Sequence, residues 1–423
     1  MPNLKFERWF QNQKKINKIN TKIINLSELD KWNSNTVAIS HDSKKFFKVV
    51  GLKVISNFFK KNWDQPIIVQ NELGVLGIIK NNKNKKYLLQ AKVEPGNKNK
   101  LQLSPTVQAT KSNYNQVHKG KTVPYLEYFL NNNKAKFINQ TEQGFRYLEK
   151  YNSNVLIKIN TKIKVRPNFF WFTLSDLLNL IKKKNIINMD TLSVFSSHIN
   201  KEKKDIALNT NKKIRLWISR CDKKYYLKRK IVPLIKLKDW IYNDKKIVHK
   251  NKKHFSIIGV SSKTNKREID QWHQPIIKGK DKAFVGYLIK KFNNTNHYLC
   301  RYILKPGLKK SALTSSVNTS DIKNFQNDNN LANFQKIILK NIFLNKKFQK
   351  DSLFENTLSD EGGRFYHCQI NYKAILLNEY FNINIPPNYI WVSQNQMIDM
   401  IKNKKLDIEA RLLFGCINLK NIE

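Results

Sequence analysis

The sequence predicts an α+β fold in which two similar modules follow each other along the chain. One observation is the run W-x-Q-P-I-I, which occurs at 63–68 and returns at 272–277. A second is that all eight tryptophans fall into pairs about half the chain apart. A third is that each half contains strand-like runs followed by a closing helix, the pattern of sheets packed with helices. We therefore expect a tandem duplication of one ancestral module.

The tryptophan pairs define how the two copies align. The separation is 208 residues for the first pair (217 − 9) and 220 for the last (391 − 171). The pairs are Trp9 with Trp217, Trp32 with Trp240, Trp63 with Trp272, and Trp171 with Trp391. Other repeated positions are Gly51 with Gly259, Gly144 with Gly363, Pro167 with Pro387, and Pro95-Gly96 with Pro306-Gly307. The growing separation predicts a surface insertion near 325–350 and domains at 1–207 and 208–423.

Each copy begins with strand-like runs and ends with an amphipathic helix. The first strands are predicted at 46–50 (FFKVV) and 255–260 (FSIIGV), before the W-x-Q-P-I-I run and a β-hairpin or meander. The closing helices are predicted after Ser175 and Ser393. Their apolar positions at helical spacing are Leu177, Leu178 and Ile181 in the first copy and Met397, Ile398 and Ile401 in the second.

The stretch 87–110 of the first copy is typical of a hairpin with one polar face. YLLQAKVE alternates apolar and polar residues, Pro95-Gly96 fits a type II turn, and LQLSPTVQAT forms the return strand. The expected apolar face consists of Tyr87, Leu89, Ala91, Val93, Leu101, Leu103, Pro105 and Val107. The expected polar face consists of Gln90, Lys92, Glu94, Ser104, Thr106, Gln108 and Thr110.

This polar face has two interpretations. Antiparallel sheets often turn one face to water, so a solvated surface is one of them. The other is a binding site, because neutral hydrogen-bonding groups with one carboxylate suit the oriented binding of a polar ligand such as a sugar. In the second copy, the corresponding residues are Arg301, Ile303, Lys305 and the run TSSVN at 314–318. We therefore predict that the first copy holds the reactive site, and that the second is scaffold or an altered nucleotide pocket.

The composition limits the class of partner and the compartment. The formal net charge is +47, which is typical of nucleic-acid or membrane-surface binding. Lysine is spread along the whole chain together with asparagine and isoleucine, as a genome rich in A and T would produce, so we do not expect nucleic acid as the main partner. Four cysteines without a CxxC pair predict neither disulfides nor structural zinc. No signal peptide or membrane span is predicted, so we expect a cytoplasmic protein.

Longer motifs of the chain resemble one enzyme family. They are W-x-Q-P-I-I-x-Q at 63–70, E-L-G-V-L-G at 72–77, Q-A-K-V-E-P-G-N at 90–97, L-S-P-T-V-Q-A-T-K-S-N-Y at 103–114, H-K-G at 118–120, P-Y-L-E-Y-F at 124–129, P-N-F-F-W-F-T-L at 167–174, N-M-D at 188–190 and E-G-G-R-F-Y-H at 361–367. With these motifs the chain resembles the NDP-hexose 2,3-dehydratases of deoxysugar biosynthesis over nearly its whole length. The resemblance is most specific over 90–129.

The resemblance implies a fold and an oligomeric state. Members of this family are built from two Nudix-like modules and are expected to be homodimers. The Nudix catalytic box, a carboxylate-rich helix that binds Mg²⁺, is absent from both halves of this sequence. We therefore expect a shared fold without pyrophosphate hydrolysis, since a fold does not fix a function.

The resemblance also implies a reaction. Water is eliminated across C2–C3 of a dTDP- or other NDP-4-keto-6-deoxyhexose, because the C4 ketone acidifies the C3 proton for a general base. A hydrogen-bond donor stabilises the enolate, and the 2-hydroxyl leaves. The enol tautomerises to a 3,4-diketo-2,6-dideoxy sugar, which a 3-ketoreductase would accept as a pathway neighbour. This route implies no metal and no redox cofactor.

The candidate catalytic residues are Glu94, as general base, with Tyr114 and His118 as alternatives. Each of the three also has a structural interpretation. Glu94 would be a carboxylate that stabilises the turn, Tyr114 an aromatic residue packed at an interface, and His118 an exposed loop histidine. The expected substrate-binding residues are Trp63, Gln65, Gln90, Lys92, Asn97, Thr106, Gln108, Lys111, Asn113, Tyr125, Arg364, Tyr366 and Trp391. The lysines and Arg364 would meet the diphosphate, and the tryptophans would either stack on the nucleobase or pack in the core.

The chain departs from the family pattern at several places. Lys111 stands where the family usually has arginine, and it supplies a charge without the bidentate fork. Leu192 stands where an arginine commonly follows N-M-D. Two other functions therefore stay open, a non-catalytic nucleotide-sugar-binding protein and a basic RNA-associated protein. Turnover of the candidate substrate, binding without turnover, and salt-dependent RNA binding would separate the three.

Overall fold

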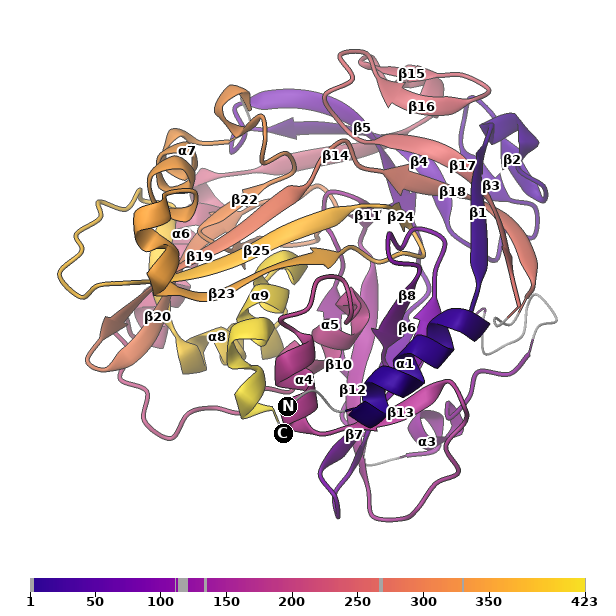
Figure 1. The fold of residues 1–423 in the computed structure, drawn as a ribbon. Coiled ribbons are helices and arrows are strands. Elements are labelled where there is room, and N and C mark those ends of the chain that lie inside the picture. The colour runs from indigo at the N-terminus through magenta and orange to yellow at the C-terminus, as the bar shows by residue number, and fades with distance from the viewer. Residues whose placement is uncertain are drawn as a thin grey trace.

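The computed structural model describes residues 4–110, 112, 121–132, 135–265, 269–328 and 331–422. Over these residues the chain forms four β-sheets with short helices packed against them (Figure 1). Two of these sheets have six strands and two have seven. The prediction of an α+β fold is therefore confirmed.

The elements of the first half occupy residues 4–197. They are α1 (Leu4–Ile16), β1 (Ile19–Ile24), β2 (Trp32–Ser34), β3 (Ile39–His41), β4 (Lys48–Ser56), β5 (Lys61–Val69), β6 (Gly74–Asn81), β7 (Lys86–Val93), β8 (Leu101–Ser104), β9 (Val107–Ala109), α3 (Glu127–Leu130), β10 (Ile138–Thr141), β11 (Tyr147–Leu148), β12 (Tyr151–Ile159), β13 (Phe169–Phe172), α4 (Leu174–Leu180) and α5 (Met189–Ser197).

The elements of the second half occupy residues 211–418. They are α6 (Asn211–Lys224), β14 (Leu227–Val232), β15 (Trp240–Tyr242), β16 (Lys246–His249), β17 (Ser256–Thr264), β18 (Gln271–Lys278), β19 (Ala283–Phe292), β20 (Thr295–Ile303), β21 (Ala312–Thr314), β22 (Val317–Thr319), α7 (Asn333–Ile338), β23 (Ser352–Ser359), β24 (Phe365–Tyr366), β25 (Gln369–Leu377), β26 (Tyr389–Ser393), α8 (Gln394–Lys402) and α9 (Ile408–Asn418).

Both halves arrange their strands in the same order, which confirms the internal repeat. The smaller sheets run β2-β3-β4-β5-β11 and β15-β16-β17-β18-β24. The larger sheets contain β10-β12-β6-β7 and β23-β25-β19-β20. The paired tryptophans also make equivalent contacts. The indole of Trp9 donates to the carbonyl of Pro167 at 2.9 Å, and that of Trp217 donates to the carbonyl of Pro387 at 2.8 Å.

Each half gives one strand to the other half. The N-terminal strand β1 pairs antiparallel with β17, and β14 pairs antiparallel with β4 (Figure 1). Because these ladders join residues far apart in the chain, the smaller sheets are completed across the repeat. The two predicted modules are therefore intertwined rather than placed side by side like beads.

The Pro-Gly turns also cross between the halves. The amide of Gly96 donates to the carbonyl of Gly362 at 2.8 Å, and the amide of Gly307 donates to the carbonyl of Gly144 at 2.6 Å. A Cβ atom at Gly96 would lie 1.8 Å from the carbonyl oxygen of Phe365, so only glycine fits this close approach. These contacts pair Gly144 with Gly362. The sequence alignment with Gly363 is therefore wrong by one residue.

The predicted return strand of the first hairpin divides into two. β8 pairs with β7, whereas β9 pairs with β6, and the chain changes partner at Pro105-Thr106. The hydroxyl of Thr106 fills the break, since it accepts from the amide of Ile79 and donates to the carbonyl of Leu88. The period-two alternation therefore does not continue through Thr106.

The described part of 325–350 is not the surface excursion that the sequence predicts. Phe325, Ile338 and Phe343 are buried, and the segment includes α7. A Cβ atom at Gly286 would lie 2.7 Å from the ring of Phe343, much as one at Gly77 would press on Phe129 in the first half. The segment therefore contributes these side chains to the core, while others such as Lys340 and Lys346 are exposed.

The closing helices are only partly where the sequence predicts them. α8 begins after Ser393, whose hydroxyl accepts from the amide of Gln396. α4, however, begins after Thr173, two residues before Ser175, and ends at Leu180. Each half then adds another helix, α5 or α9, and these two helices pack against each other between the halves (Figure 1). Among the described residues, no helix has the length and apolar character needed to cross a membrane.

Candidate active site

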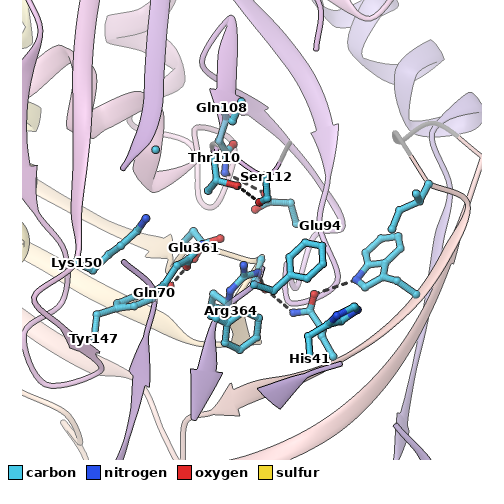
Figure 2. A pocket seen from close by; sticks show the side chains of 18 of the residues that line it. His41, Gln70, Glu94, Gln108, Thr110, Ser112, Tyr147, Lys150, Glu361 and Arg364 are labelled. Carbon is cyan, nitrogen blue, oxygen red and sulfur yellow. Dashed lines mark hydrogen bonds between the residues drawn. The ribbon is translucent and has the colours of Figure 1, made fainter. Parts of the chain in front are cut away.

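A cavity of about 450 Å³ lies where the two halves meet. The first half lines it with Lys92, Glu94 and Gln108, and the second half lines it with Glu361 and Arg364. Figure 2 shows Glu94, Gln108, Glu361 and Arg364 coming from differently coloured parts of the chain toward one space. The crossed Pro-Gly turns explain the meeting, because Glu94 precedes one turn and Glu361 precedes the glycine on which that turn docks.

Glu94 follows β7 and is held by the polar face of the hairpin. Its Oε1 accepts a hydrogen bond from Gln108 Nε2 at 3.2 Å and lies 3.6 Å from Lys92 Nζ. Asn188 Nδ2 in turn donates to Gln108 Oε1 at 3.4 Å, which fixes the direction of the amide. The Glu94 side chain is only 3% exposed, and within the described part of the chain its buried Oε2 atom has no hydrogen-bond partner. A buried carboxylate oxygen that is free to accept suits a proton acceptor in a cavity.

The second half brings Glu361 and Arg364 on one short loop. Tyr147 donates its hydroxyl to Glu361 Oε2 at 2.9 Å, which joins the two halves. A Cβ atom at Gly363 would lie 2.2 Å from Glu361 Oε1 and 3.9 Å from Glu94 Oε1, so glycine leaves room for two carboxylates. The guanidinium of Arg364 stacks over the ring of Phe47 at 4.1 Å.

A further carboxylate and a lysine form a buried pair at the same cavity. Asn152 Nδ2 donates to Glu142 Oε1 at 2.6 Å, and Lys150 Nζ donates to the carbonyl of Glu72. Burial raises the pKa of Glu142 to about 7, while Arg411 opposes this rise. Burial lowers the pKa of Lys150 to about 8, against the attraction of Glu142. Both groups therefore titrate near neutral pH.

Asp190 lies in the first turn of α5 and faces the same cavity. Burial raises the pKa of its carboxyl well above the ordinary value, and the negative charges of Glu361, Glu142 and Glu94 raise it further. Burial also raises the pKa of Glu361. Glu94, Glu142, Asp190 and Glu361 thus share one cavity in different surroundings, an arrangement suited to separate acid and base roles.

The other end of the cavity is aromatic. Trp32, Phe46, Phe47 and Trp272 line it, with His41 and His273 beside them. The indole of Trp32 donates to the carbonyl of His273 at 2.8 Å, which again joins the first half to the second. Flat rings at one end and charged groups at the other suit a ligand with a nucleobase and a polar sugar.

The structure brings Lys92, Glu94, Gln108 and Arg364 of the predicted site residues into this cavity. It does not bring Trp63 and Gln65, which line a second cavity of about 470 Å³ with Arg301 and Asn318. The reason is the crossed arrangement of the halves, by which each W-x-Q strand faces the larger sheet of the other half. In both copies the tryptophan indole donates to the glutamine side chain. The glutamine amide then donates to the backbone carbonyl of the residue before an arginine, Phe145 in one copy and Gly363 in the other.

Six other predicted residues also lie away from the cavity lining. Thr106 bridges β6 and β7, Tyr125 bonds to the backbone of Lys164 and Arg166, and Trp391 packs in the core. Gln90, Asn97 and Tyr366 are the other three, with Asn97 donating to Lys100 and Tyr366 stacked on His367. Lys111, Asn113, Tyr114 and His118 lie outside the described residues.

Sequence reasoning missed Tyr147, Lys150, Asp190, Glu361 and Trp272. Asp190 and Glu361 stand in the motifs N-M-D and E-G-G-R, which were noted without a role for these carboxylates. Trp272 belongs to the repeated W-x-Q motif, and the sequence does not show which of its two tryptophans shares a cavity with Glu94. Nothing in the sequence marks Lys150, because it is one lysine in a lysine-rich chain.

The second half differs at the position of Glu94. Lys305 stands there, outside the lining of the second cavity, and its side chain is fully buried between Asp407 Oδ2 at 2.8 Å and Glu409 Oε2 at 2.7 Å. Asp360, in the place of Glu142, receives a hydrogen bond from Gln143 Nε2. An ammonium already neutralised by two carboxylates cannot act as a base. The two cavities are therefore chemically unequal, since within the described part of the chain Glu94 leaves one oxygen without a hydrogen bond, whereas Glu409 is paired with Lys305.

The cavity between the two halves combines carboxyl groups with aromatic rings, as a site for acid–base chemistry on a polar ligand would. The comparisons with known proteins name the family. The model of the NDP-hexose 2,3-dehydratase family matches residues 3–197 and again 211–417. The chain therefore belongs to this family, and its two matches coincide with the two structural halves.

Curated relatives cover almost the whole chain. A dTDP-4-dehydro-6-deoxy-alpha-D-glucopyranose 2,3-dehydratase of Saccharopolyspora spinosa is 31% identical over 99% of this chain and 92% of the relative. Proteins of the same description from Amycolatopsis orientalis and Streptomyces violaceoruber are 29% and 27% identical, each over 97% of this chain. They span 89% and 96% of those relatives.

The raised pKa of Glu142 predicts a pH-dependent stability. In the folded protein Glu142 keeps its proton up to about pH 7, whereas the unfolded chain releases it near the ordinary value of 4.5. Its contribution to stability is therefore present below pH 4.5 and is lost as the pH rises to 7. Relative to the wild type, Glu142→Gln should gain roughly 3 kcal/mol in free energy of unfolding across this window.

Urea unfolding at several pH values checks this expectation. The exposed Glu379 provides a control, since Glu379→Gln should leave the pH dependence of the wild type unchanged. The same pH slope in Glu142→Gln as in the wild type would contradict the raised pKa.

Proposed function

We propose that this protein catalyses the 2,3-dehydration of a nucleotide-linked 4-keto-6-deoxyhexose, with dTDP as the first nucleotide to test. The observation that carries the proposal is that the family match runs through both halves while the first cavity holds Glu94 in an oriented cradle. The curated relatives are named for dTDP-4-dehydro-6-deoxy-glucopyranose, which supplies the substrate class. The product would be a 3,4-diketo-2,6-dideoxy sugar.

Glu94 is the proposed general base. The C4 ketone acidifies the C3 hydrogen, and the buried Oε2 of Glu94 has no other hydrogen bond to give up when it takes that proton. Lys92 and Gln108 hold the carboxylate on its other oxygen. Loss of the 2-hydroxyl from the enolate then gives the enol of the diketone. Tyr114 and His118 stay the alternative bases.

The nucleotide would lie toward the aromatic end of the cavity. We assign base stacking to Trp272 and Phe46 in place of Trp63 and Trp391, because only the former pair lines this cavity. Arg364 lies between the aromatic wall and the carboxyl groups, and its planar guanidinium suits the diphosphate. Lys111 and Asn113 stay candidates for the same ligand.

The fold and its limits form part of the proposal. We propose that the halves, 1–207 and 208–423, are Nudix-like modules, of which the first supplies the base and the second is scaffold or an altered pocket. The equivalent strand orders and the exchange of β1 and β14 support a duplication of one fold. Superposition of a crystal structure of this protein on known Nudix folds tests the assignment, and a poor fit of either half rejects it.

The pathway position follows from the product. A 3,4-diketone is reactive, so a reductase that reduces one ketone would act next. We propose a cytoplasmic enzyme, in keeping with four cysteines that are all free thiols. Fractionation of the source cells, with activity in the soluble fraction, would test the location.

The central prediction concerns turnover. Incubation with the dTDP-4-keto-6-deoxyhexose should give a product lighter by one water, detected by mass spectrometry. Glu94→Gln and Gln108→Ala should lower kcat/KM by about 10²–10⁴-fold, since they remove or misplace the base. The matched control is Asn318→Ala, at the place of Gln108 in the second half, which should keep the wild-type rate. Equal losses in both halves would reject the assignment.

A second prediction separates the two cavities. Trp272→Ala should raise KM about 5- to 100-fold, because stacking of one base contributes about 1–3 kcal/mol. Trp63→Ala, the same change in the other cavity, should leave KM close to that of the wild type. Steady-state kinetics of both variants gives the comparison, and the reverse result would move the active site to the second cavity.

The oligomeric state is a third prediction. The family resemblance implies a homodimer, so sedimentation at micromolar concentration should give twice the chain mass. A single-chain mass would reject the dimer without affecting the assignment of the cavity, because both halves of that cavity come from one chain.

A further inference from the structure

The two helices that pack between the halves carry equivalent polar residues with different partners. α5 is capped by Asn188 and α9 by Asp407, and each side chain accepts from an amide three residues later. Counting from these caps, Asp190 and Glu409 occupy the same helical position. The Glu94 position is taken by Lys305 in the second half. Three places thus define the same corner of each cavity.

In the second half the charged groups at this corner form ion pairs with one another. Lys305 binds both Asp407 and Glu409, and the side chains of Lys305 and Asp407 are withdrawn from water. The charges of Asp407 and Glu409 raise the pKa of Lys305, although burial opposes this rise. Glu409 therefore has a buried ammonium as its partner, which Asp190 does not have among the described residues.

In the first half the same corner has no lysine in the middle. Glu94 faces the cavity instead, and Asp190 shares the cavity with Glu94, Glu142 and Glu361. Asp190 is 3% exposed, and Lys92 is the cation that acts on it. Burial and three neighbouring carboxyl groups make the ionised form of Asp190 costly and raise its pKa well above the ordinary value. A neutral carboxylic acid beside a carboxylate base is what an elimination of water requires.

We propose that Asp190 is the general acid that protonates the departing 2-hydroxyl after Glu94 has removed the C3 hydrogen. This inference rests on the proposed dehydratase function and names a second catalytic residue for it. Asp190 is the counterpart of Glu409, just as Glu94 is the counterpart of Lys305, whose charge is opposite.

The step balances without an added reactant. Glu94 takes the C3 proton, and the C3–H electrons form the C3=C4 enolate. These electrons then form the C2=C3 bond as the C4 ketone returns, and the C2–O bond breaks with its electrons as Asp190 gives its proton to form water. Glu94 is then protonated and Asp190 is ionised. Tautomerisation moves the enol proton to Asp190 and the Glu94 proton to C2, which returns both carboxyl groups to their starting states.

The experiment compares two leaving groups in the whole enzyme. Asp190→Asn should lower the rate of water loss from the 4-keto substrate by about 10²–10⁴-fold. The same variant should eliminate fluoride from the 2-deoxy-2-fluoro analogue at close to the wild-type rate, because fluoride leaves as an anion without a proton. In deuterium oxide it should still exchange the C3 hydrogen. Glu94→Gln should lose all three activities.

The matched control is Glu409→Gln, which alters the same position of α9 and should keep wild-type water loss. A second measurement needs no variant. The wild type should lose activity toward the hydroxyl substrate at high pH, as Asp190 ionises among Glu94, Glu142, Glu361 and Lys92, and should retain fluoride loss there.

The outcomes are distinguishable. No water loss by the wild type would overturn the proposed function itself. A wild type that is active, with Asp190→Asn equally active or with fluoride loss reduced as much as water loss, would overturn the role of Asp190 alone. Parallel pH profiles for the two leaving groups in the wild type would do the same.

Discussion

The site depends on one backbone contact between the halves, the hydrogen bond from the Gly96 amide to the Gly362 carbonyl. The turn approaches so closely that a Cβ atom would collide with the backbone at Phe365. Because Glu94 precedes this turn and Glu361 precedes its acceptor, the contact places carboxylates from both halves in one cavity. The reciprocal contact at Gly307 and Gly144 repeats the geometry, and the exchanged strands β1 and β14 hold it in place. One chain thus behaves like a twofold dimer in which each half completes the cavity of the other.

Electrostatics then distinguishes two cavities that the backbone makes alike. The chain carries 78 basic and 31 acidic residues, yet the first cavity concentrates carboxyl groups. Removal from water makes their ionised forms costly, and their mutual repulsion adds to this cost. Glu142, Asp190 and Glu361 consequently have raised pKa values. In the second cavity Lys305 cancels the charges of its neighbours, so that corner is a buried ion-pair cluster rather than a reactive centre.

The duplication conserved what the fold needs and changed what the chemistry needs. Thr106 and Ser316 both fill the break between adjacent strands with one accepted and one donated hydrogen bond. In each half the Trp-x-Gln pair holds the loop that carries an arginine. These groups satisfy buried backbone polar atoms, a requirement that is the same in both copies. The side chains of Glu94 and Lys305 bind other side chains rather than the backbone, and these two positions have opposite charges.

The sequence by itself determined the α+β class, the duplication and the polar strand with Lys92, Glu94 and Gln108, because residue periodicity and rare repeated residues are local properties of the chain. It also singled out Arg364, which lines the same cavity, since one arginine beside glycine stands out in a lysine-rich sequence. Only the tertiary structure decided that Trp272 rather than Trp63 shares a cavity with Glu94, and that Asp190, Glu361 and Tyr147 meet there. Those relations depend on which half packs against which, and a pattern read along one copy contains no information about the neighbour across the interface. The burial of Thr106 was hidden for a similar reason, because a strand that changes partners keeps its alternating sequence while its side chains acquire different surroundings.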